Sequence, residues 1–275
     1  MTGPAAGQPR TGQGELRLRV ISALVLAAVV LLVTAWGGWP FRVVWTLVAG
    51  LVAFEWLSIA ATRDHAIAAA VGVVIAGLLL GFAPFSQPAL AGVAALAALA
   101  GAVLTPRTRG RLPLELCGVA YALAFSLIAP ALRAQPGIGL SLVIWSFAVV
   151  WFTDIAAYFT GRRLGGPKLM PSVSPGKTWS GAIGGALAGT LCGYVVWALT
   201  PAAQQIVGPW PVIVGSLAAS VFSQMGDLFE SALKRRFGAK DSSRLIPGHG
   251  GFLDRLDGYW AVLVFAGFVL FLAHL

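Results

Sequence analysis

The sequence contains few charged residues. Only 11% of its 275 residues are Asp, Glu, Lys or Arg, whereas soluble domains carry about 25%. This shortage excludes an ordinary soluble domain. Hydrophobic residues make up 58% of the chain, and they gather in long apolar segments that predict membrane-spanning helices.

Cysteine is also scarce. Cys117 and Cys192 each lie in an apolar stretch without metal-ligand spacing, so we expect two small buried residues and no disulfide or redox centre. Acidic residues are outnumbered by basic ones, which gives a net charge of +9. In a membrane protein such an excess marks cytoplasmic loops, and we expect no nucleic-acid partner.

Nine apolar segments predict membrane spans. They lie at about 20–36, 43–60, 66–82, 88–104, 113–132, 140–160, 179–200, 209–232 and 258–275. With the N-terminus inside, every Lys and Arg except Arg42 and Arg133 falls in a cytoplasmic segment, as the positive-inside rule requires. We therefore predict an all-α polytopic membrane protein with about nine transmembrane helices, a cytoplasmic N-terminus and the C-terminus outside.

The chain is expected to form one domain. Residues 1–19 predict a flexible cytoplasmic tail, and residues 20–275 a single integral membrane domain. The seventh predicted span carries glycine at every fourth position, and small residues at that spacing let another helix pack closely. These glycines are Gly181, Gly185, Gly189 and Gly193. The partner helix belongs either to the same chain or to a second copy in a homodimer, and both alternatives are open.

Charge is concentrated in residues 223–258. This stretch holds half of the ten acidic residues, interleaved with basic side chains and His249. The acids are Asp227, Glu230, Asp241, Asp254 and Asp257. In a chain otherwise suited to lipid, such a concentration is where chemistry is expected.

Two pairs of acids in this stretch share one spacing. Asp227 and Glu230 lie at i, i+3 in the eighth span, and Asp254 and Asp257 repeat this spacing at the start of the last. Carboxylates one helical turn apart share a face and repel each other unless a cation lies between them. We therefore predict that they hold Mg²⁺, alone or with a second cation, which bridges to phosphates. For Asp241, neutralisation of neighbouring bases in a solvated loop is an equal alternative.

The same stretch matches a long, irregular pattern. It runs S-x-x-K-R, then K-D, then a hydrophobic residue followed by P-x-H-G-G-x-x-D-R-x-D. The matching residues are Ser231, Lys234, Arg235, Lys240, Asp241, Ile246, Pro247, His249, Gly250, Gly251, Asp254, Arg255 and Asp257. This pattern resembles the signature of the phosphatidate cytidylyltransferases, also called CDP-diacylglycerol synthases.

A second polar element lies around the sixth and seventh spans. A T-D-x-x-A-Y-x-x-G-R run containing Asp154, followed by S-P-x-K-T, is similar to another element of the same family. Asp154 falls inside a span, where an ionisable residue is either functional or a hydrogen-bonded structural group. By the resemblance, the substrate phosphates would be contacted by Ser174, Lys177 and Thr178. The family often has an acid where this chain has Ser180, which leaves the role of that position open.

The resemblance is densest over residues 151–258 and implies a reaction. CTP and phosphatidate would give CDP-diacylglycerol and pyrophosphate in a bacterial inner membrane, with the active site near the cytoplasmic face. The implied catalytic residues are Asp227, Lys234, Asp254 and Asp257, and the implied metal ligands are Asp227, Glu230, Asp254 and Asp257. The implied substrate-binding residues are Asp154, Ser174, Lys177, Thr178, Arg235, Lys240, Asp241, His249 and Arg255.

Two other functions fit parts of the pattern. An ion-coupled transporter also carries acids within its spans, but here the ionisable residues gather near one edge of the membrane. A CTP-dependent lipid kinase uses the same nucleotide and would release CDP. Of the remaining acids, Glu55 is expected to pair locally, with Arg63 as its nearest base. Glu115 is expected to be either a solvated end residue or one that complements the dipole at a helix start.

Overall fold

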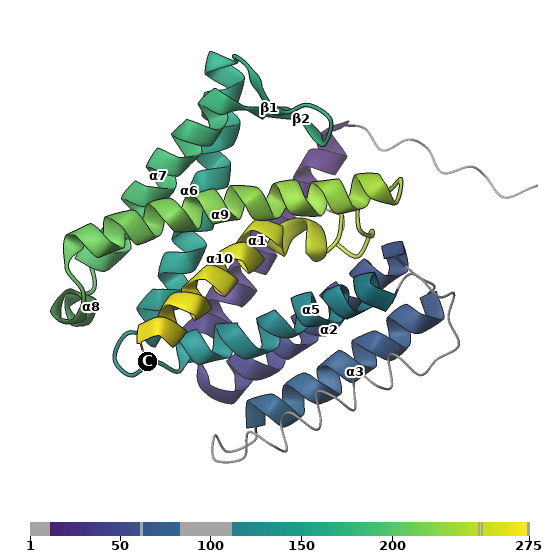
Figure 1. The fold of residues 1–275 in the computed structure, drawn as a ribbon, viewed down its shortest axis with the longest axis horizontal. Coiled ribbons are helices and arrows are strands. Elements are labelled where there is room, and N and C mark those ends of the chain that lie inside the picture. Colours follow the sequence, from purple (N-terminus) through teal and green to yellow (C-terminus); the bar gives the residue numbers. More distant parts are fainter. Residues whose placement is uncertain (1–11, 61–62, 83–111, 247, 249, 274–275) are drawn as a thin grey trace, which may run out of the picture.

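The computed structural model describes residues 12–60, 63–82, 112–246, 248 and 250–273, and helices dominate this part of the chain (Figure 1). The elements are α1 (Gly12–Trp36), α2 (Gly38–Ala60), α3 (Arg63–Phe82), α5 (Leu112–Arg133), α6 (Gly139–Leu164), β1 (Lys168–Met170), β2 (Ser174–Thr178), α7 (Trp179–Ala198), α8 (Pro201–Ile206), α9 (Pro209–Arg236) and α10 (Leu253–Ala273).

The helices α2, α5, α6, α7, α9 and α10 are each long and apolar enough to cross a membrane. The predicted first and third spans correspond to shorter apolar stretches, Val20–Trp36 in α1 and Ala66–Leu80 in α3. The predicted span at 88–104 lies outside the described residues. The chain is therefore a helical integral membrane protein, as predicted, while the count of nine spans stays a prediction.

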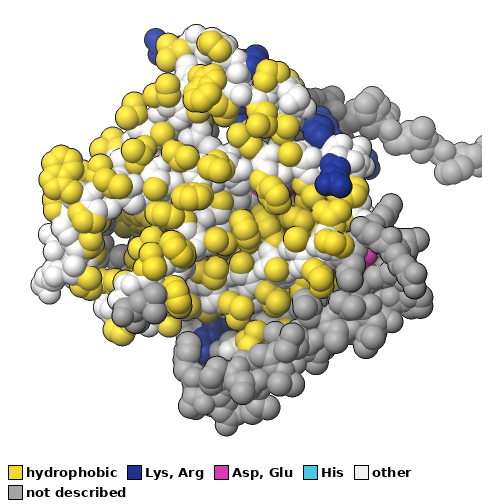
Figure 2. All heavy atoms as spheres, in the orientation of Figure 1, with side chains coloured by type: hydrophobic (Ala, Val, Ile, Leu, Met, Phe, Trp, Pro, Cys, Tyr) yellow, Lys and Arg dark blue, Asp and Glu magenta, His cyan; other side chains and the backbone are white. Residues whose placement is uncertain are grey.

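The surface agrees with a lipid environment. Figure 2 shows hydrophobic side chains spread over the visible face, with Lys and Arg at its margins. On α7, for example, Ile183, Leu187 and Leu191 are all exposed at successive turns. Cys117 and Cys192 are free thiols, but Cys117 is exposed and Cys192 half-buried, so the prediction that both are buried is wrong. An apolar residue on a lipid-facing helix satisfies the same hydropathy pattern as a core residue, so the pattern alone does not separate the two.

Two groups of helices meet at α10. One group contains α2, α3 and α5, the other α6, α7 and α9, and α10 packs against members of both (Figure 1). An aromatic cluster joins the groups, with ring centroids of Trp45 and Phe125 5.8 Å apart, Trp45 and Tyr259 5.3 Å apart, and Phe147 and Tyr259 4.5 Å apart. These buried rings hold the N-terminal and C-terminal parts of the chain together.

The glycine stripe of α7 packs within the chain. A Cβ added to Gly185 would lie 2.7 Å from the carbonyl oxygen of Thr153 in α6. At Gly193 it would collide with the hydroxyl of Ser216 in α9. Of the two alternatives left open by the sequence, close packing inside one chain is therefore confirmed. The homodimer stays a prediction.

One local feature differs from the all-helical prediction. Strands β1 and β2 form an antiparallel hairpin between α6 and α7, with Lys168 opposite Thr178 and Met170 opposite Ser174. Such short strands, built around Pro and Gly, show no alternating hydrophobic pattern that sequence analysis can detect. Helix α1 begins at Gly12, within the segment 1–19 that was predicted to be a tail.

Candidate active site

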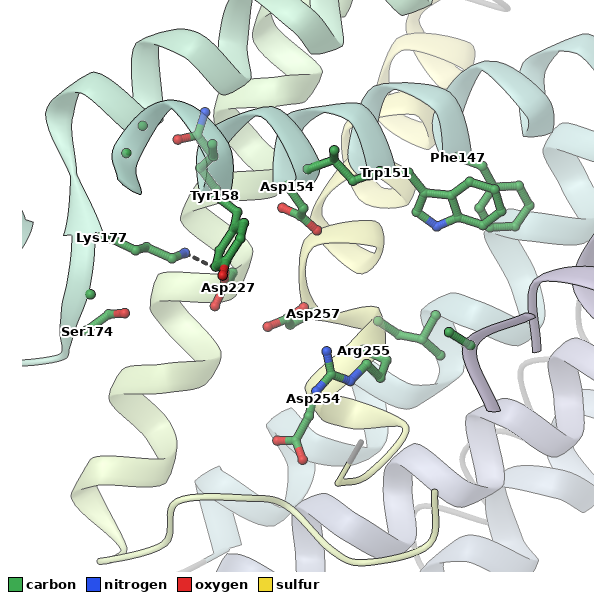
Figure 3. Close-up of a pocket in the computed structure, with 18 of the residues that line it drawn as sticks. Phe147, Trp151, Asp154, Tyr158, Ser174, Lys177, Asp227, Asp254, Arg255 and Asp257 are labelled. Atoms are coloured by element: carbon green, nitrogen blue, oxygen red, sulfur yellow. Dashed lines mark ion pairs between the residues drawn. The ribbon is translucent and has the colours of Figure 1, made fainter. Parts of the chain in front are cut away.

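A cavity of about 1240 Å³ lies among α1, α2, α6, α7, α9, α10 and the hairpin. One part is apolar and is bordered by α1, α2 and the α6 side chains Phe147 and Trp151. The other part is polar and is bordered by the hairpin, α9 and the first turns of α10 (Figure 3). The cavity therefore offers charged and apolar walls to the same ligand.

Glycines bring Asp227 and Asp257 to the cavity wall. Helices α9 and α10 cross closely at Gly226, which has no side chain. A Cβ at this position would lie only 2.5 Å from the carbonyl oxygen of Asp257. On the other helix, a Cβ on Gly258 would lie 2.6 Å from the hydroxyl of Ser223. Each aspartate is next to one of these glycines in the sequence, so the crossing places both acids at the same level of the cavity.

Asp154 joins them from α6. Figure 3 shows its carboxylate directed into the same space as those of Asp227 and Asp257. Asp257 lies within electrostatic range of both other carboxylates and of Glu230. We call Asp154, Asp227 and Asp257 the cavity acids. Three like charges in one space favour the approach of a cation or a basic side chain.

Basic side chains border the same cavity. Lys177 of the hairpin forms an ion pair with Asp227 of α9, which ties the hairpin to the cavity wall (Figure 3). The other basic residues of the lining are Arg162, Lys168 and Arg255. The polar part thus presents both carboxylates, which bind cations, and bases, which bind phosphates.

Eight of the predicted site residues border the cavity. They are Asp154, Ser174, Lys177, Thr178, Asp227, Asp254, Arg255 and Asp257. Thr178 also has a structural role, because its Oγ1 accepts a hydrogen bond from the N–H of Gly181 at 3.1 Å and caps α7. Ser180, whose role was open, donates a hydrogen bond to the carbonyl oxygen of Gly165. It therefore supports the turn after α6.

Two predicted residues of α9, Glu230 and Lys234, form a buried ion-pair site with Asp254 of α10, which also borders the cavity. The Nζ atom of Lys234 lies 2.7 Å from an oxygen of Glu230 and 2.7 Å from an oxygen of Asp254. Glu230 is only 1% exposed, and neither Glu230 nor Lys234 is among the described residues that line the cavity. We call Glu230 and Asp254 the bridged acids. Lys234 bridges them and links α9 to α10, and its single positive charge offsets one of the two carboxylate charges.

Three predicted residues lie after the cavity-bearing part of α9. Arg235, Lys240 and Asp241 are exposed and do not appear among the described lining residues. Arg235 donates a hydrogen bond to the carbonyl oxygen of Ala239 at 3.2 Å. His249 lies outside the described residues. Substrate contacts by these residues stay predictions.

Sequence reasoning missed Glu55. This residue of α2 is fully buried, and its partners are Ser242, Ser243, Phe252 and Leu253, nearly two hundred positions away along the chain. The expectation of a local partner is replaced by contacts with the signature loop, which we define as the described residues 237–246, 248 and 250–252. A buried acid in an apolar sequence was the only available signal. Arg162 and Lys168 were also missed, although Arg162 belongs to the family-like run.

The donor chemistry of the cavity suits a hard cation. Among the residues that the structure describes, no three acidic, His or Cys side chains form a complete metal site. Mg²⁺, however, is commonly held by one or two carboxylates while substrate phosphates and water complete its shell. Asp227 and Asp257 fit that arrangement, although Asp227 also pairs with Lys177, while Glu230 and Asp254 share the more deeply buried Lys234. Metal binding by the four predicted acids stays a prediction.

These features define a class of protein: a membrane-embedded enzyme with an amphipathic cavity and an acidic and basic polar end. The model of the cytidylyltransferase family matches residues 17–273. The chain belongs to that family, which confirms the family resemblance inferred from the signature.

Relatives include proteins named phosphatidate cytidylyltransferase. The Brucella suis protein is 43% identical over 262 residues, which cover 94% of this chain and 93% of the relative. The Brucella abortus protein is 42% identical over the same share of both chains. A Staphylococcus epidermidis protein is 43% identical over 125 residues, or 46% of this chain and 47% of its own.

Proposed function

We propose that this protein transfers a cytidylyl group from CTP to phosphatidate and forms CDP-diacylglycerol and pyrophosphate. The observation that carries the proposal is the amphipathic cavity, in which acids and bases line one end and apolar helices the other. A nucleoside triphosphate requires the first environment and an acylated phosphate requires both. The names of the full-length relatives support the same substrates.

The reaction joins two anions, so charge is its main obstacle. An oxygen of the lipid phosphate attacks the α-phosphorus of CTP and forms a new P–O bond. The bond from that phosphorus to the β-bridging oxygen breaks, and pyrophosphate leaves with the electron pair. The lipid phosphate is itself the nucleophile, so the protein has to orient the reactants and stabilise the charge.

We assign these tasks to the polar end of the cavity. Lys177 and Arg255 attract the phosphates, and Ser174 offers a hydroxyl beside them. Asp227 and Asp257 would hold Mg²⁺, with Asp154 as the third nearby acid. When bound, the metal would supply Lewis-acid stabilisation of phosphate oxygens. Glu230, Asp254 and Lys234 act on this arrangement by fixing α9 against α10.

We further propose that the polar end faces the cytoplasm of a bacterial inner membrane, with the N-terminus inside and the C-terminus outside. The distribution of Lys and Arg along the sequence supports this orientation. The hairpin and the signature loop then lie on the side where CTP is present.

A double-label assay tests the reaction. The protein is purified in detergent and incubated with phosphatidate, Mg²⁺ and CTP labelled with ³²P at either the α or the γ position. We expect the α label to enter the lipid and the γ label to appear in pyrophosphate. Addition of EDTA should abolish both transfers if the assigned metal is required.

The two labels separate the alternatives. A parallel reaction contains an alcohol lipid in place of phosphatidate; if the γ label enters that lipid and CDP is released, the protein is a lipid kinase. If neither label moves in protein shown to be folded, the transferase proposal is wrong and ion transport is the next function to test. Transfer that persists in EDTA would retain the transferase and reject the metal assignment.

A further inference from the structure

Glu55 accepts an unusual number of hydrogen bonds for a buried residue in an apolar helix. It lies in α2, is 0% exposed and is surrounded in the sequence by apolar side chains. A carboxylate that is removed from water must be stabilised by hydrogen bonds or by a partner charge. All four of its described hydrogen bonds come from the signature loop and the start of α10.

The four donors are divided evenly between the two oxygens. Oε1 accepts from the hydroxyl of Ser243 at 2.6 Å and from the N–H of Phe252 at 3.0 Å. Oε2 accepts from the hydroxyl of Ser242 at 3.1 Å and from the N–H of Leu253 at 2.7 Å. The first N–H groups of a helix lack intrahelical partners and carry partial positive charge. Glu55 therefore supplies an external acceptor at the start of α10.

The loop is held from a second side by Asp254. Its carboxylate accepts from the N–H of Gly251 at 2.8 Å and from the N–H of Ser242 at 3.0 Å, and it pairs with Lys234. Ser242 is thus held twice, by its hydroxyl on Glu55 and by its amide on Asp254. The two acids fix both the loop and the first turn of the helix.

Gly251 shows how tightly Glu55 fits. A Cβ at this position would lie 2.5 Å from each carboxylate oxygen of Glu55 and would also collide with the hydroxyl of Ser242. Only glycine lets the loop pass over the carboxylate without displacing it. The second glycine of the H-G-G pattern is therefore a packing requirement imposed by a residue of α2.

We propose that Glu55 is a positioning residue that sets the place of the first turn of α10, and with it the Asp257 carboxylate, for the transfer reaction. The inference rests on the proposed function. Asp257 lies one turn beyond Asp254. Any shift of the first turn of α10 therefore moves Asp257 relative to Asp227, which lies on the other side of the helix crossing. Misplacement of a reacting group by about 1 Å costs about 10²-fold in rate.

The decisive variant is Glu55→Gln. The amide keeps one oxygen acceptor, but its NH₂ group replaces the other. Because each oxygen of Glu55 accepts one backbone N–H, either the N–H of Phe252 or that of Leu253 is left without its acceptor. We expect kcat per folded molecule to fall about 10²-fold, while KM for CTP changes little. Glu55→Asp keeps the carboxylate and should recover part of the activity.

A second measurement does not depend on turnover or on metal. Hydrogen–deuterium exchange in metal-free detergent solution should show faster exchange at the amides of Phe252 and Leu253 in Glu55→Gln. The matched control is Glu115→Gln, another buried acid, in the first turn of α5. It should leave both kcat and these two amides unchanged.

Each outcome decides the proposal. Unchanged kcat or unchanged exchange at residues 252–253 in folded Glu55→Gln overturns the positioning role. If that variant does not fold, the double variant Ser242→Ala/Ser243→Ala is used, which removes two hydrogen-bond donors and keeps the Glu55 carboxylate. A fall in its kcat supports the positioning role. An unchanged kcat overturns it. A wild-type protein that is folded but inactive refutes the proposed function. In that case the exchange experiment still tests whether Glu55 holds the start of α10.

Discussion

The cavity acids and the bridged acids differ in environment although their sequence patterns are the same. Each i, i+3 pair has one acid that pairs with Lys234 and one that does not: Glu230 pairs with it and Asp227 does not, while Asp254, which also borders the cavity, pairs with it and Asp257 does not. One helix face can border two environments, because residues one turn apart lie about 5 Å apart along the axis. Shared spacing therefore does not establish a shared role.

The two groups also differ in how their charge is balanced. The bridged acids share one ammonium group, that of Lys234, so their charge contributes to the packing of α9 against α10. The cavity acids point into a space large enough for substrate (Figure 3), where only Asp227 has an ion-pair partner among the described residues. We therefore expect substitutions of the bridged acids or their lysine to lower stability, and substitutions of the cavity acids to lower turnover.

The largest effect is expected for Asp257→Asn. The substitution preserves the shape of the side chain but removes a charge that faces the cavity, so cytidylyl transfer should fall by about 10²–10³-fold. The melting temperature in detergent should remain within a few degrees of the wild type, because no buried ion pair is broken. Radiolabel transfer and thermal unfolding measure the two quantities, with Glu115→Gln as control. Full activity in Asp257→Asn would remove this residue from the cavity chemistry.

Lys234→Met should lower stability strongly, in contrast to Asp257→Asn, which should lower activity. It leaves Glu230 and Asp254 close together without their cation, and loss of one member of a buried ionic network costs about 3–5 kcal/mol of unfolding free energy. A large drop in melting temperature is expected, and adding Glu230→Gln should reverse part of it. If Lys234→Met is stable but inactive, the catalytic role predicted from the signature is correct and the structural role is wrong.

The smallest effect is expected for Lys177→Gln. Its ion pair with Asp227 joins partly exposed side chains, so its loss changes stability by at most about 1 kcal/mol. Loss of a charged hydrogen bond to a phosphate should raise KM for CTP about tenfold. Steady-state kinetics compare it with Arg236→Gln, an exposed base at the end of α9. Equal KM values in the two variants would contradict a phosphate contact by Lys177.

Much of the fold could be predicted from hydropathy. Every predicted span within the described residues coincides with a helix, because a run of apolar residues long enough to cross the bilayer has few alternatives to helical structure. The hairpin was missed because its few residues carry no periodic pattern. Glu55 was placed correctly in a helix but given the wrong surroundings, since its donors come from the opposite end of the chain.

The sequence by itself determined the apolar helices, the family, and the residues that carry charge, because these depend on composition and on local order. Only the tertiary structure decided which acids pair with Lys234 and which face the cavity without it. It also decided that Glu55 supports α10 and that the glycines of α7 pack within the chain. These outcomes depend on helix crossings, where a side chain meets residues far away in the sequence, and no local pattern encodes those neighbours.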